Sequence, residues 1–346
     1  MLVVIRADCS LQIGTGHVMR CAALAMRLRR YQAKVHLLCC GLSSLLKSWL
    51  EINSILVHIL EPAVACDWNL DAYHTINLCR SLGNIDLLVV DNYQLDFKWE
   101  LSLRPYVRRI LVIDDLANRK HDCDFLLDQN LRRNSETRYE PYLPLSAKTF
   151  LGPCFALLRP EFDAPGLIRS RDGKLKRLLI FFGGTDPGNQ SLKVIKALHL
   201  LDLNDIFVTL ILGDSHCDPP SVYSCATGMT NIEIIRFSSK MSLLISHADL
   251  AIGTCGVAAW ERCLLGLPSI NVITAENQRE DAEILHEFGA IFNLGDSDNV
   301  HANHIADAVL ALRNDQSRLA SMSIKAQSIM SNCKESFYEL EKALLG

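Results

Sequence analysis

The sequence predicts an α/β protein with two doubly wound halves, each a parallel sheet flanked by helices. Short apolar runs rich in β-branched residues alternate with longer amphipathic segments along the 346 residues. The short runs are almost continuously apolar, which is typical of strands buried on both faces of a sheet. The regular alternation of such strands with helices favours parallel pairing through crossover helices.

Both halves carry this alternation. In the first half the expected strands are Leu2–Ile5, Val35–Cys39, Ile55–Ile59, Leu87–Val90, Ile110–Ile113 and Phe125–Leu127, and the expected helices include Val18–Arg30 and Ser43–Leu50. In the second half the expected strands are Arg177–Phe182, Phe207–Leu212, Ile232–Arg236, Leu250–Ile252, Ser269–Val272 and Ile291–Asn293. The expected helices there include Gln190–His199, Met241–Ser246, Gly256–Leu265, Glu280–Glu287, Ala302–Ala311 and Arg318–Leu345.

Two domains are expected, at residues 1–163 and 174–346, with a linker near 164–173. The linker region concentrates proline, glycine and charged residues, a mixture typical of an exposed connection. Ligands of open α/β sheets bind beyond the carboxyl ends of the strands, and pockets are common between domains. We therefore expect functional side chains among the polar and glycine residues that directly follow strands.

Composition argues against several classes of partner. The net charge is −4, from 35 Lys and Arg against 39 Asp and Glu. Nucleic-acid binding needs clustered cations, so no nucleic-acid partner is expected. The apolar run Met1–Ile5 is shorter than the roughly 7–15 residues of a signal peptide core. No stretch approaches the ~18–20 apolar residues of a membrane span. A cytoplasmic protein is expected.

The cysteine and histidine patterns indicate neither a disulfide framework nor a metal centre. The 13 cysteines are scattered and form no C-x-x-C motif, so free thiols in a reducing compartment are expected. His121-Asp122-Cys123-Asp124 has ligand-type side chains. Successive positions of an extended segment point to opposite faces, so these side chains converge poorly on one ion. No metal and no cofactor are expected.

The loop after the first strand carries the first candidate site. Gly14 and Gly16 let the backbone turn tightly where a helix begins. His17 lies at that helix start, where the positive end of the dipole keeps the imidazole neutral and able to accept a proton; a histidine that only caps and packs is the alternative. Asp8 is a candidate for capping the helix or orienting the ring. Arg20 faces either a phosphate or solvent.

Two further polar groups follow strands of the first half. Asp91-Asn92-Tyr93 places a carboxylate, an amide and a phenol at the end of a buried strand. Asp114-Asp115 follows the next strand. Asp and Asn are also common in turns and caps, which remains the alternative for both groups.

The second half offers glycine-rich loops suited to phosphates. The loop after its first strand contains Gly183, Gly184, Thr185 and Asp186. Cys255, Gly256 and Val257 open a later helix, whose N–H groups can bind a diphosphate. Glu261, further along that helix, can accept hydrogen bonds from two ribose hydroxyls, or is a solvated carboxylate. Asn277 and Gln278 supply amides to a sugar or to a helix start.

Taken in order, these segments resemble the UDP-2,4-diacetamido-2,4,6-trideoxy-β-L-altropyranose hydrolases of pseudaminic acid biosynthesis. The resemblance spans nearly the whole chain and extends to the GT-B nucleotide-sugar enzymes, including the UDP-N-acetylglucosamine transferase of peptidoglycan synthesis. The matching residues are Arg6-x-Asp8, Gln12-Ile13-Gly14-x-Gly16-His17-x-x-Arg20, Asp91-x-Tyr93, Ala156-Leu157-x-Arg159-x-Glu161-Phe162, Gly183-Gly184-Thr185-Asp186, Glu261 and Asn277-Gln278.

The resemblance implies two Rossmann-like domains in a GT-B arrangement with an interdomain cleft and a UDP-binding C-terminal half. It also implies metal-independent hydrolysis of the sugar C1–O bond with inversion. His17 would be the base that deprotonates water, and Asp91 and Tyr93 would orient water or sugar. The Gly183–Asp186 loop and the helix start at Cys255–Val257 would hold the diphosphate. The carboxylate of Glu261 would hold the ribose.

Two residues depart from the family pattern. Asn92 stands where the family has the His of Asp-His-Tyr, and Trp260 stands where it has an Asn before its Glu. A transferase of the same fold, which needs an acceptor, is the first alternative. A non-catalytic UDP-sugar-binding module is the second, but it would not need His17. The sequence carries no signal for an oligomeric state.

Overall fold

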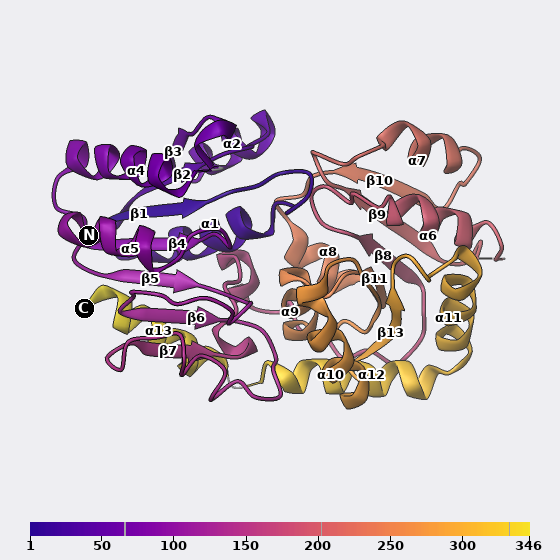
Figure 1. The fold of residues 1–346 in the computed structure, drawn as a ribbon. Coiled ribbons are helices and arrows are strands. Elements are labelled where there is room, and N and C mark those ends of the chain that lie inside the picture. Colours follow the sequence, from indigo (N-terminus) through magenta and orange to yellow (C-terminus); the bar gives the residue numbers. More distant parts are fainter. Residues whose placement is uncertain (66, 202, 332) are drawn as a thin grey trace. The chain divides into compact units, whose positions relative to one another are not determined.

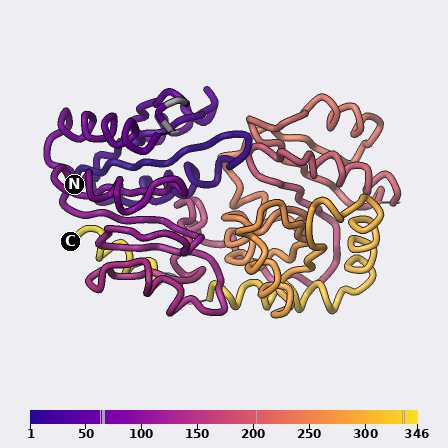
Figure 2. The backbone as a smooth tube through the Cα atoms, in the orientation of Figure 1, coloured from indigo at the N-terminus to yellow at the C-terminus, as the bar shows by residue number. Residues whose placement is uncertain are grey.

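A computed structural model describes residues 1–65, 67–201, 203–331 and 333–346. The chain forms two compact units, each with its own sheet (Figure 1). Unit 1 contains Met1–Pro160 and the C-terminal helix α13 (Cys333–Leu345), and unit 2 contains Glu161–Ser331. Both chain ends therefore belong to unit 1 (Figure 2).

Unit 1 is built on a parallel sheet in the order β3-β2-β1-β4-β5-β6-β7. The strand order reverses between β1 and β4, which are neighbours in the sheet. The strands are β1 (Leu2–Ala7), β2 (Lys34–Cys39), β3 (Leu56–Ile59), β4 (Leu87–Asp91), β5 (Ile110–Ile113), β6 (Phe125–Asp128) and β7 (Lys148–Leu151). The helices are α1 (Gly16–Arg29), α2 (Ser44–Ile52), α3 (Pro62–Ala65), α4 (Trp68–Leu82), α5 (Phe97–Leu103), η1 (Arg104–Tyr106), η2 (Pro153–Phe155) and α13.

Both faces of this sheet are buried, which explains the continuous apolar runs. Val3 and Ile5 of β1 pack in the core that α1, α2 and α13 complete. Val4, between them, packs with α4 and α5 on the other face. Because successive side chains of a strand alternate between faces, both sets of positions must be apolar here.

Unit 2 repeats the architecture with the order β10-β9-β8-β11-β12-β13 and a reversal between β8 and β11. Its strands are β8 (Arg177–Phe181), β9 (Phe207–Leu212), β10 (Ile232–Arg236), β11 (Leu250–Gly253), β12 (Ser269–Ile273) and β13 (Ile291–Asp296). Its helices are α6 (Gln190–Leu198), α7 (Pro219–Cys225), α8 (Met241–His247), α9 (Val257–Leu264), η4 (Glu276–Gln278), α10 (Arg279–Phe288), α11 (Ala302–Asn314) and α12 (Gln316–Ile329). The short turn η3 (Pro160–Asp163) spans the division between the units.

The predicted fold class is confirmed, and every expected strand is present with its ends shifted by three residues or fewer. The edge strand β7 was missed because its four residues are not a continuous apolar run. The helix expected over Arg318–Leu345 is two helices, α12 and α13.

Side-chain caps fix where many of the helices begin. Ser43, Asp67 and Asn189 accept hydrogen bonds from the first backbone N–H groups of α2, α4 and α6. Such caps satisfy donors that the helix itself leaves free. In contrast, α1 and α9 are among the helices that begin without a side-chain cap. Their first N–H groups remain available to other acceptors.

The segment expected to be an exposed linker, 164–173, is held against unit 2. Arg171 is 7% exposed, and its guanidinium donates to the carbonyls of Ala248 (3.0 Å) and Leu265 (2.6 Å). Arg169 donates to the carbonyl of Ser246 (2.6 Å). These carbonyls lie at the ends of α8 and α9, where a cation is favourable. The division falls between residues 160 and 161 because these arginines fasten the segment to unit 2.

The expected second domain, residues 174–346, included the last helix, but α13 belongs to unit 1. Leu340 and Leu344 of α13 are fully buried in the core of unit 1. Arg109 donates to the carbonyls of Ala343 (3.1 Å) and Leu344 (2.9 Å) at the helix end. Burial of apolar side chains and these two hydrogen bonds fix α13 in unit 1.

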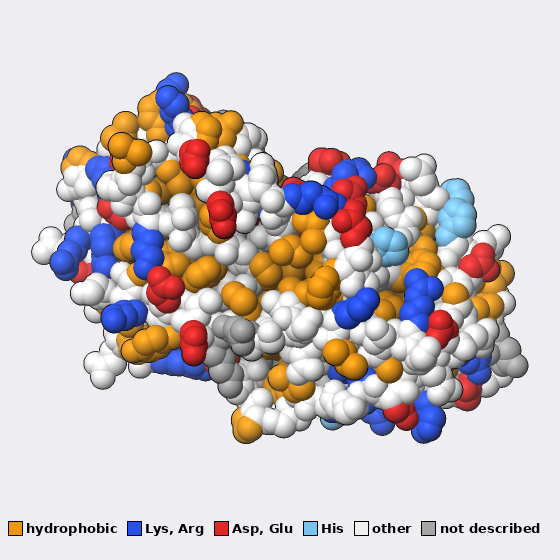
Figure 3. Space-filling model, turned by 90° about the horizontal axis from the view of Figure 1, so that it is seen from below, with side chains coloured by type: hydrophobic (Ala, Val, Ile, Leu, Met, Phe, Trp, Pro, Cys, Tyr) orange, Lys and Arg blue, Asp and Glu red, His pale blue; other side chains and the backbone are white. Residues whose placement is uncertain are grey.

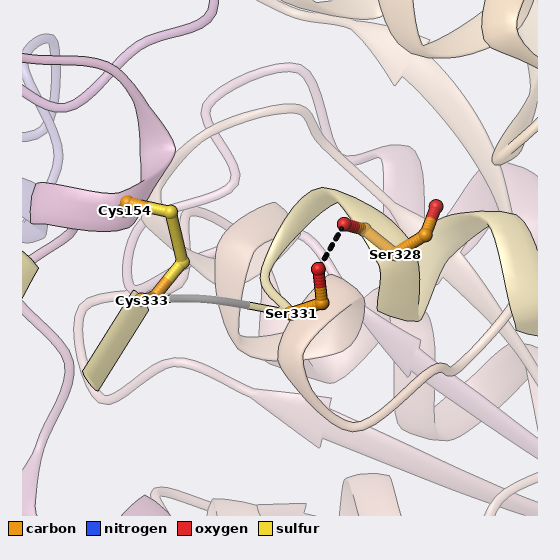
Figure 4. The surroundings of a disulfide bond; sticks show 4 residues. All are labelled: Cys154, Ser328, Ser331 and Cys333. Carbon is orange, nitrogen blue, oxygen red and sulfur yellow. Dashed lines mark hydrogen bonds between the residues drawn. A yellow bond between two sulfur atoms is a disulfide. The ribbon is translucent and has the colours of Figure 1, made fainter. Parts of the chain in front are cut away.

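A disulfide joins Cys154, in η2, to Cys333, the first residue of α13 (Figure 4). Figure 4 also shows Ser331, whose hydroxyl donates to the Ser328 carbonyl (2.9 Å). The expectation of free thiols is therefore wrong for this pair, whose members are 179 residues apart and meet only because α13 returns to unit 1. Cys9, Cys21 and Cys255 are among the described cysteines that keep free thiols.

No helix in the described ranges is long and apolar enough to cross a bilayer. On the face drawn in Figure 3, basic and acidic side chains are interspersed.

The disulfide predicts that reductant lowers the free energy of unfolding. Closing a loop of this length restricts the unfolded chain, and native disulfides typically contribute about 2–4 kcal/mol. Urea unfolding of the protein with and without dithiothreitol measures the loss. The double variant Cys154→Ser/Cys333→Ser is the control and is expected to be insensitive to reductant. Peptide mapping that finds both cysteines as thiols in air-oxidised protein would contradict this assignment.

Candidate active site

In unit 1 the reversal of strand order places two loops side by side. Ala7 at the end of β1 is paired with Asp91 at the end of β4. The segments that follow these strands leave the same edge of the sheet, where open α/β sheets bind ligands. His17, the second residue of α1, thereby reaches Asp91, with Nδ1 lying 2.6 Å from Oδ1.

The charge on Asp91 fixes the form of the His17 ring. Burial raises the pKa of Asp91, but the charge of Arg20 and the hydrogen bonds from Arg20 and His17 outweigh it and hold that pKa well below its usual range. A carboxylate can only accept, so Nδ1 of His17 donates its proton to Asp91. In the neutral form of the ring Nε2 carries the lone pair, and no hydrogen bond from any described residue reaches it. His17 is 9% exposed.

Arg20 binds two carboxylates at once. Its Nε and Nη2 each lie 2.7 Å from an oxygen of Asp91, and its Nη1 lies 3.0 Å from both oxygens of Asp115. The side chain is 4% exposed. The expectation that Arg20 faces a phosphate or solvent is wrong, because this bidentate pairing draws the guanidinium into the interior.

Tyr93 closes the cluster. Its hydroxyl donates to Asp115 Oδ2 at 2.5 Å, and its ring stands edge-on to the His17 ring with centroids 4.7 Å apart. Burial and the charge of Asp115 raise the pKa of Tyr93, so the phenol stays neutral. Asp114-Asp115 was expected as a polar group after a strand, with a turn or cap as the alternative, and no partner was assigned to it. The signal was the position of Asp115 two residues after β5, the strand next to β4.

Asp8 lies outside the cluster. Its carboxylate accepts from Arg6 (2.7 Å), from the backbone N–H of Cys40 (2.7 Å) and from Asn92 Nδ2 (2.8 Å). The expectation that Asp8 caps α1 or orients the ring of His17 is wrong, since its oxygens are engaged by these donors. Asn92, the departure from the family pattern, here ties the end of β4 to the end of β1.

The glycines before α1 shape the approach to this cluster. Gly14 has φ +74°, a conformation that L side chains rarely adopt, and its N–H donates to the Ser10 carbonyl (2.9 Å). Gly16 is the first residue of α1, and a Cβ there would meet nothing within 4 Å. Substrate binding by either glycine stays a prediction.

Unit 2 has the corresponding arrangement at its own reversal. Gly253 at the end of β11 is paired with Phe181 at the end of β8, and a Cβ on Gly253 would lie 2.4 Å from the Phe181 carbonyl oxygen. The Gly183–Asp186 loop follows β8 and the start of α9 follows β11. The two predicted phosphate loops thus leave neighbouring strands.

The side chains of the first loop are turned inward. Asp186 accepts from the N–H groups of Gln190 and Ser191, each at 2.8 Å, at the start of α6. Burial raises its pKa, but hydrogen bonding from His216 and Ser191 lowers it more, so the carboxyl is ionised. Thr185 is 4% exposed. Asp186 therefore acts as a helix cap, and what the loop offers a ligand is the backbone around Gly183 and Gly184.

The start of α9 offers donors to an anion. Gly256 precedes the helix and Val257 is its first residue, with no side-chain cap. A Cβ on Gly256 would lie 3.9 Å from Gln278 Nε2, so this amide flanks the helix start. Uncapped N–H groups, the helix dipole and a side-chain amide together favour a negatively charged group.

The remaining predicted residues of unit 2 differ in their accessibility. The Cys255 side chain is 2% exposed, and Sγ accepts from Asn271 Nδ2 at 2.8 Å. Burial raises the pKa of its thiol to about 12, so the side chain is neutral and only the backbone can face a ligand. Glu261 is 6% exposed on α9, and Asn277 is half-buried in η4.

Three of the ligand-type side chains of His121–Asp124 form hydrogen bonds or ion pairs with other residues of the protein. His121 Nδ1 lies 2.7 Å from Glu100, and Arg104 lies 2.6 Å from both Asp122 and Asp124. Among the described residues no group of three or more His, Cys, Asp or Glu side chains is placed to hold a metal ion.

Two parallel sheets with alternating helices, each with its site at a reversal of strand order, define a two-domain α/β protein of the GT-B class. Solved structures agree. MurG of Acinetobacter baumannii is similar with a TM-score of 0.62 and 15% identity over 99% of both chains. UGT2 of Phytolacca americana, solved with UDP-2-fluoro-glucose and pterostilbene, is similar with a TM-score of 0.69 and 13% identity over 99% and 98% of the chains. These likenesses show the fold.

Sequence comparison then identifies the family. The glycosyltransferase family 28 C-terminal domain matches residues 178–342. The chain is 30% identical to the UDP-2,4-diacetamido-2,4,6-trideoxy-β-L-altropyranose hydrolase of Campylobacter jejuni over 293 residues, 84% of this chain and 97% of the relative. It belongs to that hydrolase family, as the motifs of the sequence predicted.

Two other relatives are longer than the region they share with this chain. Uncharacterized protein MJ1062 of Methanocaldococcus jannaschii is 26% identical over 81% of this chain and 57% of its own length. The spore coat polysaccharide biosynthesis protein SpsG of Bacillus subtilis is 24% identical over 46% of this chain and 48% of its own length. The match thus spans about half the length of each of these two relatives.

A buried carboxyl next to the cluster gives a pH prediction. Asp128, at the end of β6, is 2% exposed, and burial and the charge of Asp115 raise its pKa from 3.8 to about 6. The folded state therefore holds this proton more tightly than the unfolded state. Its contribution to stability falls as pH rises from about 4 through about 6, because only the folded state is penalised by ionisation.

We expect the wild type to lose about 2–3 kcal/mol of unfolding free energy relative to Asp128→Asn between about pH 4 and pH 7. Urea unfolding of both proteins at several pH values measures the difference, and the variant serves as the control for all other titrating groups. A difference that stays constant with pH would contradict the raised pKa.

Proposed function

We propose that this protein hydrolyses UDP-2,4-diacetamido-2,4,6-trideoxy-β-L-altropyranose at the anomeric C1–O bond, in the cytoplasm, as a step of pseudaminic acid biosynthesis. The products are UDP and the free sugar, formed with inversion and without a metal ion. The observation that carries the proposal is the position of the His17 ring, whose Nδ1 is 2.6 Å from the ionised Asp91, so that Nε2 of the neutral ring bears the lone pair. The Campylobacter relative, which bears this activity in its name, supports the choice of substrate.

In unit 1 the reacting group is Nε2 of His17. As the water oxygen bonds to C1, Nε2 takes one water proton, and the C1–O bond to the diphosphate breaks with its electron pair left on UDP. Asp91 keeps the ring in the required tautomer and stabilises the imidazolium that forms. Attack by water from the face opposite the leaving group gives inversion.

In unit 2 the proposed task is to hold UDP. The uncapped N–H groups at the start of α9, with Gln278 beside them, suit the diphosphate, whose charge increases as the C1–O bond breaks. The Gly183–Gly184 backbone allows a close approach from the neighbouring strand. The carboxylate of Glu261 would accept hydrogen bonds from the ribose hydroxyls.

A glycosyltransferase is the alternative function. MurG shares the fold, and the family 28 domain matches the second half of the chain. A transferase would use the same base on an acceptor hydroxyl instead of water. Turnover without any acceptor distinguishes the two.

The test is the release of UDP and free sugar from the UDP-sugar with no acceptor present. His17→Ala is expected to lose about 10²–10⁴-fold in kcat, because proton abstraction by a positioned base contributes that much. Its affinity for UDP, measured by calorimetry, is expected to change little. Glu261→Ala should do the opposite and chiefly weaken UDP binding, by about 10-fold or more, because a charged hydrogen-bond partner is lost.

The exposed Glu283→Ala is the matched control for Glu261→Ala and should leave both quantities unchanged. Near-normal turnover in His17→Ala would remove the base assignment. UDP binding without turnover in the wild type, relieved by an added acceptor, would favour the transferase.

A further inference from the structure

We propose that Asp115, which has no part in the reaction scheme above, is a positioning residue for His17. Its negative charge is balanced by the positive charge that His17 gains when it takes a proton. Its carboxylate also holds the Tyr93 phenol against the His17 ring. The effect on rate rests on the proposed function. The electrostatic coupling itself does not, because it is a property of the unliganded cluster.

Asp115 is bound into the cluster on two sides. It is 5% exposed, and its oxygens accept from Arg20 Nη1 at 3.0 Å and from the Tyr93 hydroxyl at 2.5 Å. Arg20 in turn binds Asp91, which holds Nδ1 of His17. Asp115 thus reaches the reacting ring through two separate contacts, the guanidinium and the edge-on phenol.

The charges of the cluster do not cancel while His17 is neutral. Arg20 supplies one positive charge. Asp91 and Asp115 supply two negative charges, because Arg20 holds the pKa of both carboxyls below the usual range although burial raises it. Tyr93 and the Cys21 thiol, which donates to Asp91 at 3.5 Å, stay neutral because burial raises the pKa of each.

Charged groups of both signs lie beyond Asp115, and the charges of Arg132 and Arg138 both act on Asp128. Arg138 donates to Asp128 (2.9 Å) and to the backbone carbonyl of Asp115 (3.1 Å). Arg119 pairs with Asp114 (2.6 Å) on the other side. Counted by themselves, the side chains of His17, Arg20, Asp91 and Asp115 carry one net negative charge before proton transfer and none after it.

The loss of this net charge favours the transfer of a proton from water to His17. A net charge in a buried site is costly, so a proton taken from water by His17 relieves that cost as it arrives. An interaction that is stronger after proton transfer than before it lowers the barrier. With Asp91 alone, Arg20 would already complete a neutral pair, and the proton on His17 would create a buried positive charge. The second carboxylate is what makes the ring an effective base.

The experiment is an NMR titration of the histidine rings in the full-length, unliganded protein, comparing the wild type with Asp115→Asn. Removing one negative charge should move the midpoint for His17 down by about one pH unit or more, the usual effect of a charge at this range. Asp114→Asn is the matched control. The Asp114 carboxylate is used by Arg119 and the N–H groups of Leu116 and Ala117, so this variant should leave the midpoint in place.

Asp115→Glu keeps the charge and should restore the wild-type midpoint. If Asp115→Asn does not fold, Tyr93→Phe takes its place. Without the Tyr93 hydroxyl, the negative charge of Asp115 is less compensated, so the titration midpoint of His17 should rise. An unchanged or lowered midpoint in Tyr93→Phe, or an unchanged one in folded Asp115→Asn, would overturn the proposal.

Activity supplies the second readout. In Asp115→Asn the acid limb of the kcat/KM profile should move to lower pH by the same amount as the His17 titration, with kcat lowered roughly threefold to tenfold and KM little changed. A merely structural role would lower activity without moving the limb. If the midpoint shifts but the wild type does not hydrolyse the UDP-sugar, the proposed function fails and the coupling stands. If hydrolysis occurs and the midpoint does not shift, the coupling fails and the function stands.

Discussion

A buried arginine between two carboxylates is the interaction on which the chemistry proposed for unit 1 depends. Without Arg20, Asp91 and Asp115 would repel each other and one would be protonated. His17 and Arg20 are three residues apart on α1, so they lie on one face of that helix and approach Asp91 together. The same guanidinium that stabilises the cluster keeps Asp91 ionised. An ionised Asp91 in turn accepts the proton on Nδ1, which leaves Nε2 of the neutral ring for the base role proposed above.

The strand order of each unit decides where such clusters can form. In unit 1 the reversal between β1 and β4 brings the start of α1 to Asp91, and in unit 2 the reversal between β8 and β11 brings two glycine-containing loops together. Both α1 and α9 begin without side-chain caps. In the proposed function, unit 1 supplies the base that activates water and unit 2 supplies N–H donors for the departing diphosphate.

The fold was largely predictable because strands buried on both faces leave continuous apolar runs such as Leu87–Val90. The edge strand β7 could not be predicted, because an edge strand needs no continuous apolar run. The return of α13 to unit 1 could not be predicted either, because the residues that pack against Leu340 lie far away in the sequence. Within the candidate site, His17 could be singled out because it lies at the start of a helix, directly after a glycine-containing loop. The partners of Asp8 and Arg20 could not be assigned, because a charged side chain after a strand is compatible with a cap, an ion pair or a ligand. Only the register of β1 and β4 decides among these.

The most direct test of the account is turnover of the UDP-sugar in ¹⁸O-water without an acceptor, with the products analysed by mass spectrometry beside His17→Ala. A base that directs water to C1 predicts one ¹⁸O in the free sugar and none in UDP, with both products nearly absent in the variant. Heavy oxygen in UDP would mean attack at phosphorus. That result would contradict the assignment of His17 as the base for hydrolysis at carbon.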